Sequence, residues 1–88
     1  MKVEFSAKFS KDLDSIKKES TKQAILATIE ELEQAENLRD LRGLKKLVGH
    51  SSAFRIRIGD YRLGFFFEKD GVLLGRIAHR KDIYSLFP

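Results

Sequence analysis

The sequence has 88 residues, of which 42% are hydrophobic and 34% charged, and it contains no cysteine. This length allows one domain with a modest core, and the composition is that of a folded globular protein. The lack of cysteine excludes a disulfide framework and a thiolate metal site. The N-terminus shows no signal-peptide pattern, and no apolar run is long enough to span a membrane. We therefore expect a single domain over residues 1–88, located in the cytoplasm.

The net charge of +4 is unevenly distributed along the chain. Residues 1–40 carry 7 Lys/Arg and 9 Asp/Glu, a net charge of −2, whereas residues 41–88 carry 10 Lys/Arg and 4 Asp/Glu, a net charge of +6. A one-sided basic surface favours a polyanionic partner such as a nucleic acid. The alternative is a solvated basic face that only keeps the domain in solution.

Two helices are expected after a short first strand at residues 3–5. Apolar residues recur at helical spacing over about residues 7–18, and they do so again after a break near residue 20. Two consecutive helices with a short break predict an antiparallel helical hairpin. The residues that carry these patterns are Phe9, Leu13 and Ile16 in the first helix, with Ser20 or Thr21 as the cap and Ile25, Ile29, Leu32 and Ala35 as the buried stripe of the second.

Residues 37–52 have no clean period and are expected to form a connecting loop. Four basic residues of this loop are candidates to contact a bound polyanion: Arg39, Arg42, Lys45 and Lys46. The alternative is that they are simply solvated. The expected apolar anchors of the loop are Leu41, Leu44 and Leu47.

From residue 53 the apolar period becomes 2, which predicts three antiparallel strands. Gly59-Asp60 favours a two-residue turn, and Lys69-Asp70-Gly71 favours a three-residue turn with Gly71 in the left-handed conformation. The first turn pairs Ile58 with Tyr61, Arg57 with Arg62, Ile56 with Leu63, and Arg55 with Gly64. The second pairs Glu68 with Val72, Phe66 with Leu74, Gly64 with Arg76, and Arg62 with Ala78.

This register predicts one apolar sheet face, ready to receive the helices, and one basic face. The apolar face consists of Phe54, Ile56, Ile58, Tyr61, Leu63, Phe65, Phe67, Leu73 and Ile77. The basic face consists of Arg55, Arg57, Arg62 and Arg76, with Arg80 just past the last strand, Gly64 and Ala78 among the arginines, and Phe66 and Leu74 at the far end.

Like charges directly opposite each other on a sheet cost roughly 0.2–1 kcal/mol per pair, so an arginine row is disfavoured unless an anion lies within it. Arginine binds phosphate with two parallel hydrogen bonds and stays charged in any environment. The small residues Gly64 and Ala78 leave room for a ligand near the backbone. Tyr84 is placed to stack on a base. The pattern therefore predicts a phosphate-binding cleft for single-stranded nucleic acid. The alternative is exposed arginines paired with Asp60, Glu68 and Asp82.

The two histidines predict no metal site, because they do not stand at metal-ligand spacing with acidic residues. His79 has the parity of the apolar face and is expected at its rim. No cofactor is expected.

The stretches FRIRIGDYRLGFFF and GRIAHRKDIY resemble the RelE/ParE superfamily of type II toxin–antitoxin toxins, and most closely its RelE-like branch. The similarity covers nearly the whole chain. It implies an α+β, RelE-like fold: a short N-terminal strand, a two-helix hairpin, and an antiparallel three-strand meander with the helices packed on one face.

The resemblance also implies a function: cleavage of mRNA in the ribosomal A site without a metal, by attack of the 2′-OH on the neighbouring phosphodiester. The implied partners are a cognate antitoxin, in a hetero-oligomer, and the ribosome with its mRNA. The implied catalytic residues are Arg62 and Arg80, which stabilise phosphate charge, and Tyr84, which stacks on a base and places the 2′-OH. The implied RNA-binding residues are Arg55 and Arg57. Arg76 on the predicted basic face and Lys45 and Lys46 in the basic loop are expected to bind RNA as well.

The general base stays open at this point, because Arg55 and Arg57 remain protonated and cannot serve. His79, Tyr84, or no base at all are the alternatives. Two other functions are also compatible with the resemblance: a ParE-like inhibitor of DNA gyrase, and a catalytically degenerate toxin that acts mainly in a repressor complex. The antitoxin is expected to place a carboxylate near the arginine row or to displace the segment that carries Tyr84.

Overall fold

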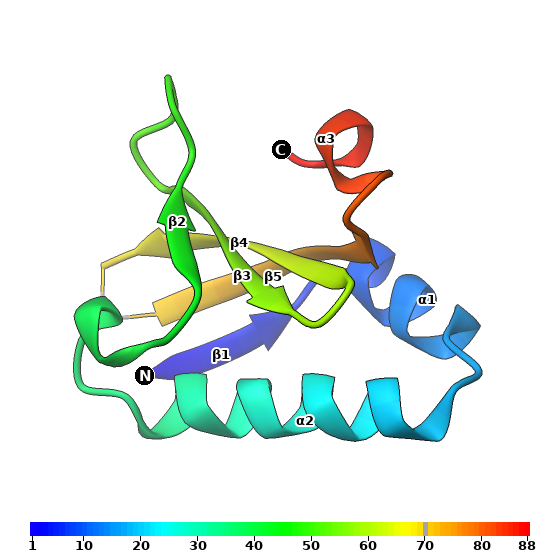
Figure 1. Ribbon diagram of the computed structural model, residues 1–88. Coiled ribbons are helices and arrows are strands. Elements are labelled where there is room, and N and C mark those ends of the chain that lie inside the picture. Colours follow the sequence, from blue (N-terminus) through cyan, green and yellow to red (C-terminus); the bar gives the residue numbers. More distant parts are fainter. Residues whose placement is uncertain (70) are drawn as a thin grey trace.

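The computed structural model describes residues 1–69 and 71–88, which form a five-stranded sheet with two helices on one side and a short helix on the other (Figure 1). The strand order is β1-β5-β4-β3-β2, with β1 parallel to β5 and the other neighbours antiparallel. The elements are β1 Lys2–Phe5, α1 Ala7–Ser15, α2 Glu19–Gln34, the 3-10 helix η1 Leu38–Asp40, β2 Leu44–Lys46, β3 Ala53–Ile58, β4 Tyr61–Glu68, β5 Gly71–His79 and α3 Ile83–Leu86.

The predicted α+β fold, with its first strand, two helices and three-strand meander, is confirmed. The first strand adds to the meander as the neighbour of β5. In Figure 1, α2 runs below the sheet, α1 lies at the right-hand end of the sheet, and α3 lies above it. α1 and α2 run in broadly opposite directions. No helix in the described part of the chain is long and apolar enough to cross a membrane.

The two long helices differ from prediction mainly at their ends. Ser6 caps α1, because its Oγ accepts a hydrogen bond of 3.1 Å from the Phe9 N–H. The expected cap of the second helix at Ser20 or Thr21 is wrong. That helix begins at Glu19, whose carboxylate suits the positive end of the helix dipole. The predicted buried stripe is confirmed for Ile25, Ile29 and Leu32, while Ala35 is half-buried at the end of the helix.

The loop predicted over residues 37–52 is wrong in part, because it contains η1 and the strand β2. Three residues are too few to show a period of 2, so this strand is set by its pairing with β3. Gly43 turns the chain into it with a φ of +70°. Of the expected anchors, Leu41 and Leu44 pack against the main core, and Leu47 packs on the opposite sheet face.

The β3–β4 hairpin has the predicted register at all four pairs, from Arg55 opposite Gly64 to Ile58 opposite Tyr61. Gly59 has the positive φ, +58°, that this two-residue turn requires at its first central position.

The β4–β5 hairpin follows the prediction only near its open end. Arg62 pairs with Ala78 and Gly64 with Arg76 as expected, but the register then shifts at a β-bulge, so Gly75 has no partner opposite it. The expected pairs Glu68–Val72 and Phe66–Leu74 are therefore wrong, and the observed pairs are Glu68–Gly71, Phe67–Val72 and Phe66–Leu73.

The predicted three-residue turn of this hairpin is also wrong, because Gly71 already belongs to β5. Asp70 lies outside the described residues. The positive φ expected for Gly71 is found at Lys69, at +55°. Because of the bulge, the side chains at the start of β5 point to the sheet faces opposite those predicted. Leu74 and Val72 are buried in the core, whereas Leu73, predicted to be buried, is 42% exposed.

Two apolar clusters hold the layers together. The larger lies between the sheet and the helices α1 and α2, around Phe9, Leu32 and Phe65. The smaller lies on the opposite sheet face and joins Ile83 and Phe87 to the sheet. The predicted basic face is therefore shared with the C-terminal segment.

Candidate phosphate-binding site

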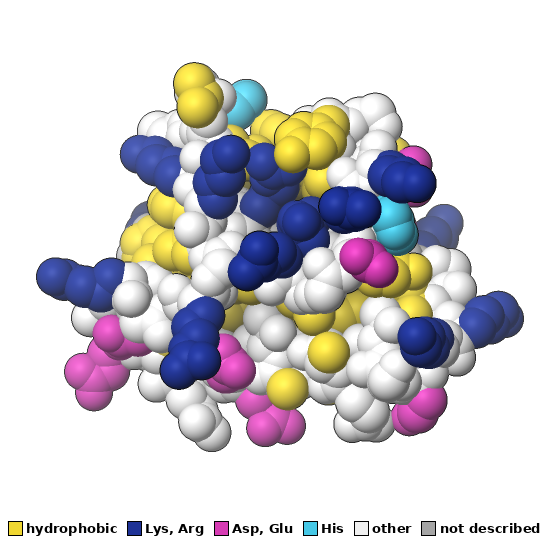
Figure 2. Space-filling model, in the orientation of Figure 1, with side chains coloured by type: hydrophobic (Ala, Val, Ile, Leu, Met, Phe, Trp, Pro, Cys, Tyr) yellow, Lys and Arg dark blue, Asp and Glu magenta, His cyan; other side chains and the backbone are white. Residues whose placement is uncertain are grey.

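An open hollow of about 410 Å³ lies on the sheet face opposite α1 and α2. Strands β2, β3 and β4 form its floor and sides, and α3 closes one end. Figure 2 shows Lys and Arg side chains gathered in the upper part of the molecule, between the β2–β3 connection and α3. None of the described residues that line the hollow is acidic. The lining residues are Gly43, Leu44, Lys45, Arg55, Arg57, Arg62 and Tyr84.

Arg55 is only 8% exposed, although it is charged. Its guanidinium carbon lies 4.4 Å from the centre of the Tyr84 ring, a cation–π contact that contributes roughly 0.5–1 kcal/mol. Within residues 1–69 and 71–88, its Nε is a buried donor without a hydrogen-bond partner. Buried donors are normally paired, so this N–H is available to an acceptor atom of a ligand.

Tyr84 is 74% exposed and lies at the edge of the hollow. Hydrogen bonding and positive charge from the Arg55 guanidinium lower the pKa of the Tyr84 phenol below its usual range, and the charges of Lys45 and Arg62 add to this effect. The site therefore favours a negatively charged oxygen at this point.

Arg57 and Arg62 stand directly opposite each other, as the register predicts. Arg62 tolerates this neighbour because its Nη1 donates hydrogen bonds of 2.9 Å to the carbonyl oxygens of Gly59 and Tyr61. Arg57 is exposed, and its guanidinium remains available to a ligand.

Arg76 is not brought into this hollow, although the predicted basic face includes it. Its guanidinium donates two hydrogen bonds, of 2.7 and 3.0 Å, to the carboxylate of Asp12 on α1. Hydrogen bonding to this carboxylate raises the pKa of Arg76, burial opposes the increase, and the charge of the carboxylate adds a smaller increase. Asp12 also accepts a hydrogen bond from the Ile77 N–H. Arg76 therefore binds α1 to the edge of β5.

Arg80, Lys46 and His79 also lie outside the lining of the hollow. Arg80 is exposed and stands 4.0 Å from the carboxylate of Asp60, which is a weak surface pair. Lys46 is exposed on β2, next to the lining residue Lys45.

His79 lies at the rim of the helix-covered face, as predicted, with its ring edge-on to Tyr61 at 5.8 Å. Its Nδ1 accepts a hydrogen bond from the Lys81 N–H. The ring lines a separate hollow of about 390 Å³ beside the start of α2.

The expectation that Gly64 and Ala78 leave open space for a ligand is wrong. A Cβ atom at Gly64 would overlap the ring of Phe87, and Ala78 packs in the same apolar cluster as Phe87. The C-terminal segment of the chain occupies this floor. The sequence does not indicate Gly43 and Leu44 as lining residues, because it shows no period for the three-residue strand β2, which Gly43 precedes and Leu44 begins.

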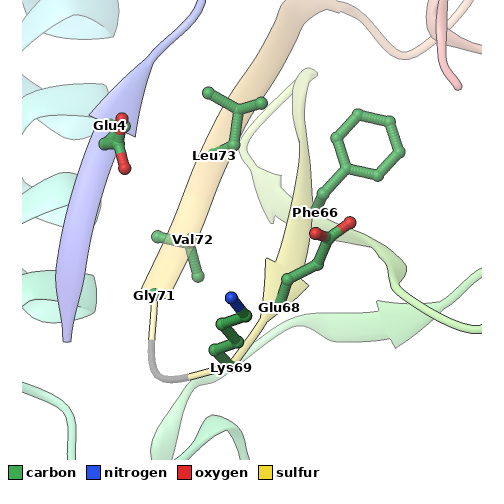
Figure 3. Close-up of a pocket in the computed structure, with 7 residues that line it drawn as sticks. All are labelled: Glu4, Phe66, Glu68, Lys69, Gly71, Val72 and Leu73. Carbon is green, nitrogen blue, oxygen red and sulfur yellow. The ribbon is translucent and has the colours of Figure 1, made fainter.

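A further hollow of about 330 Å³ lies near the β4–β5 turn (Figure 3). Phe66 and Leu73 point to the same side of the sheet there, and Glu4 and Glu68 supply two carboxylates. These two carboxylates outnumber Lys69, the one cation among the described lining residues, so this hollow suits a phosphate less well than the cation-lined hollow beside Tyr84.

Comparisons with known proteins agree with this fold. The family model described as ParE toxin of the type II toxin–antitoxin system parDE matches residues 3–84. The chain is 39% identical, over 89 residues and the full length of both proteins, to Toxin RelE3 of Methanocaldococcus jannaschii.

Solved structures similar to this one include two archaeal complexes. A chain of the RelB–RelE antitoxin–toxin complex from Methanococcus jannaschii superposes with a TM-score of 0.80 at 35% identity, covering 97% of this chain and 99% of that one. A chain of the archaeal RelE–RelB complex from Pyrococcus horikoshii shares the fold, with a TM-score of 0.72 at 21% identity over 93% of this chain and 97% of that one.

A small α+β domain with this sheet order is thus the fold of a type II toxin. The chain belongs to the ParE toxin family of type II toxin–antitoxin systems, within the RelE/ParE superfamily, and its full-length relative is a RelE toxin. The resemblance found in FRIRIGDYRLGFFF and GRIAHRKDIY is confirmed.

Proposed function

We propose that this toxin is a ribosome-dependent, metal-independent endoribonuclease that cuts mRNA in the A site by 2′-OH attack. The observation that carries the proposal is the hollow beside Tyr84. Its lining contains four cationic side chains, Lys45, Arg55, Arg57 and Arg62. Four cations from three strands match a phosphodiester and its flanking phosphates. A surface that only binds protein would not need this concentration of like charge.

The proposed reaction places the scissile phosphate among the arginines. The 2′-oxygen gives up its proton and bonds to phosphorus, and the bond from phosphorus to the 5′-oxygen breaks. The products are a 2′,3′-cyclic phosphate and a 5′-OH that has taken up a proton. Negative charge on the phosphoryl oxygens increases toward the phosphorane, so arginines held in place beforehand stabilise the transition state more than the ground state.

Tyr84 is the proposed acceptor of the 2′-OH proton. Its hydroxyl lies among the cations, which lower its pKa and so raise the fraction of phenolate at neutral pH. His79 is a weaker candidate, because it lines a different hollow. Arg80, Lys46 and Arg76 lie outside the hollow. The catalytic role of Arg80 and the RNA contacts of Lys46 and Arg76 remain predictions.

We further propose that the toxin acts in the cytoplasm and pairs with a cognate antitoxin. The related structures from Methanococcus jannaschii and Pyrococcus horikoshii are complexes of RelE with RelB. Because the hollow is basic, the antitoxin should place a carboxylate beside Arg55, Arg57 or Arg62, or it should displace α3 and Tyr84. A structure of the complex with both regions free would contradict this.

Primer extension on mRNA in purified, programmed ribosomes tests the nuclease directly. We expect cuts at A-site codons with the parent protein and their loss with Arg62→Ala. Arg39→Ala is the matched control, because Arg39 is an exposed arginine on η1 outside the hollow. Absence of cuts by the folded parent protein would refute the proposal and leave the gyrase inhibitor and the degenerate toxin, which a supercoiling assay separates.

Gyrase inhibition is the second candidate, because the matching family model carries the ParE name. It predicts that the protein blocks supercoiling by purified gyrase and leaves ribosome-bound mRNA intact. We expect instead that the protein leaves gyrase supercoiling unchanged and cuts ribosome-bound mRNA.

A further inference from the structure

The C-terminal segment of the described chain has one buried side and one exposed side. Ile83 and Phe87 stand four residues apart and are buried, whereas Tyr84 points away from them and is exposed. The Phe87 N–H donates a hydrogen bond of 2.9 Å to the Ile83 carbonyl. A helix of four residues is not stable alone, so its position depends on these side-chain contacts.

Phe87 lies in a socket made by two glycines on neighbouring strands. Its side chain contacts Gly64 on β4 and Gly75 on β5, and a Cβ atom at Gly75 would come within 2.7 Å of the ring. The Phe66 ring packs beside it, with the ring centres 5.0 Å apart. The β-bulge supplies part of this socket, since Gly75 is the residue that has no partner in the register.

The socket is next to the phosphate-binding hollow. Gly64 pairs directly with Arg55 across the β3–β4 hairpin. The same β4 position thus supports the Phe87 ring and neighbours the arginine on which Tyr84 rests.

We propose that Phe87 is a positioning residue: by seating its ring on Gly64 and Gly75, it holds α3 so that Tyr84 lies against the Arg55 guanidinium at the phosphate-binding hollow. The seating of the segment is a property of the fold, and only its consequence for RNA rests on the proposed nuclease. Phe87 itself does not line the hollow.

The pKa of the Tyr84 phenol depends on whether the side chain lies against Arg55, so its titration reports the position of Tyr84. The sequence contains two tyrosines and no tryptophan, so Tyr84 is the only phenol in a Tyr61→Phe background. Ultraviolet absorbance then gives its titration. We expect Phe87→Ala to raise the pKa of Tyr84 toward the value of about 10 for an isolated tyrosine, because the phenol leaves Arg55. Leu86→Ala, which alters the neighbouring and partly exposed residue, should leave the titration unchanged.

Two further variants keep the proposal testable if Phe87→Ala does not fold. Circular dichroism shows whether each variant is folded. Gly75→Ala keeps the Phe87 ring but fills its socket, so it should raise the pKa of Tyr84 as Phe87→Ala does. Phe87→Leu keeps an apolar side chain and should give an intermediate value. If Phe87→Ala does not fold, these two decide. Folded variants in which Tyr84 titrates as in the parent would overturn the proposal.

Cleavage on programmed ribosomes separates this proposal from the nuclease. We expect Phe87→Ala to lower the single-turnover rate about 10- to 100-fold, because misplacement of an active-site group by about 1 Å has effects of this size. If the titration shifts but the parent does not cleave, the positioning role stands and the nuclease fails. If cleavage falls while the titration is unchanged, the positioning role is wrong.

Discussion

Arg55 and Arg57 stand two residues apart on the same strand and point to the same sheet face, yet only Arg55 is buried. The difference arises because Tyr84 covers the Arg55 guanidinium, whereas Arg57 lies beside the turn at Gly43 and stays exposed. Burial of a charged group with an unpaired donor is unfavourable, so Arg55 gains most from a bound anion. Alternation along β3 predicted the direction of both side chains but not this difference.

Arg55→Lys should therefore reduce cleavage more than Arg57→Lys. Lysine keeps the charge but loses the planar guanidinium that stacks on Tyr84 and carries the unpaired Nε. We expect a loss of about tenfold or more in single-turnover rate for Arg55→Lys, which equals about 1.4 kcal/mol of transition-state stabilisation, and a smaller loss for Arg57→Lys. Equal losses would show that burial of Arg55 has no part in the reaction.

The rate of cleavage should rise with pH until Tyr84 is ionised, and it should level off below the pH of about 10 at which a free tyrosine titrates. The reason is that hydrogen bonding and charge from Arg55, together with the charges of Lys45 and Arg62, lower the pKa of Tyr84. The remaining cation among the described lining residues is Arg57. Single-turnover rates across pH test this. Tyr84→Phe should lower the rate and remove the rising limb. A limb that persists in Tyr84→Phe would assign it to another group.

Among the elements, α1 completes the sheet where β1 ends. β1 pairs with β5 only as far as Phe5 opposite Leu74. Beyond that point, α1 and its cap form hydrogen bonds with the edge of β5. Ser6 donates from its N–H to the Leu74 carbonyl and from its hydroxyl to the Gly75 carbonyl. The Asp12 carboxylate accepts a hydrogen bond from the Ile77 N–H. This helix–edge contact takes Arg76 away from the arginine row.

Asp12→Ala should lower the free energy of unfolding by about 1–3 kcal/mol, because it leaves the half-buried Arg76 guanidinium and the Ile77 N–H without their acceptor. Equilibrium unfolding in urea measures this. Asp14→Ala is the matched control, since Asp14 is an exposed residue of the same helix, and it should change stability by less than about 0.5 kcal/mol. Equal effects of the two variants would show that the edge contact does not stabilise the fold.

Local chemistry explains which elements the sequence predicts well. The β3–β4 hairpin follows from Gly59, whose positive φ fixes the turn and thereby every pair in the register. The β4–β5 register depends instead on a bulge at Gly75, next to a ring contributed by Phe87 twelve residues later. A contact of this kind leaves no periodic signal, and the bulge moves Leu73 and Leu74 to the faces opposite those predicted. Arg76 and Arg80 lie outside the hollow for a similar reason, because their carboxylate partners come from α1 and from the β3–β4 turn.

For the molecule as a whole, charge is separated between two sides. Figure 2 shows Asp and Glu side chains mainly over the α2 side and Lys and Arg over the hollow. This agrees with the net charges of −2 and +6 on the two parts of the sequence. Such a separation orients the molecule as it approaches a polyanion, with the hollow toward the nucleic acid.

Association with programmed ribosomes should therefore weaken as salt increases. If the hollow contacts phosphates, removal of one cation should reduce the slope of log affinity against log salt by about 0.7, the value for a single-stranded nucleic acid. Binding titrations at several salt concentrations with Lys45→Ala test this. Lys46→Ala should have a smaller effect, since Lys46 does not line the hollow. An unchanged slope for Lys45→Ala would place the contact elsewhere.

The outer strands of the sheet are short, with four residues in β1 and three in β2. An exposed strand edge offers unpaired backbone groups to strands of other chains, and short, lysine-bearing edges resist such pairing. At β2, Lys45 and Lys46 occupy two of the three edge positions. At the opposite side, α1 covers the part of β5 that β1 leaves free. The positive charge that suits the hollow to RNA thus also makes the sheet a poor template for aggregation.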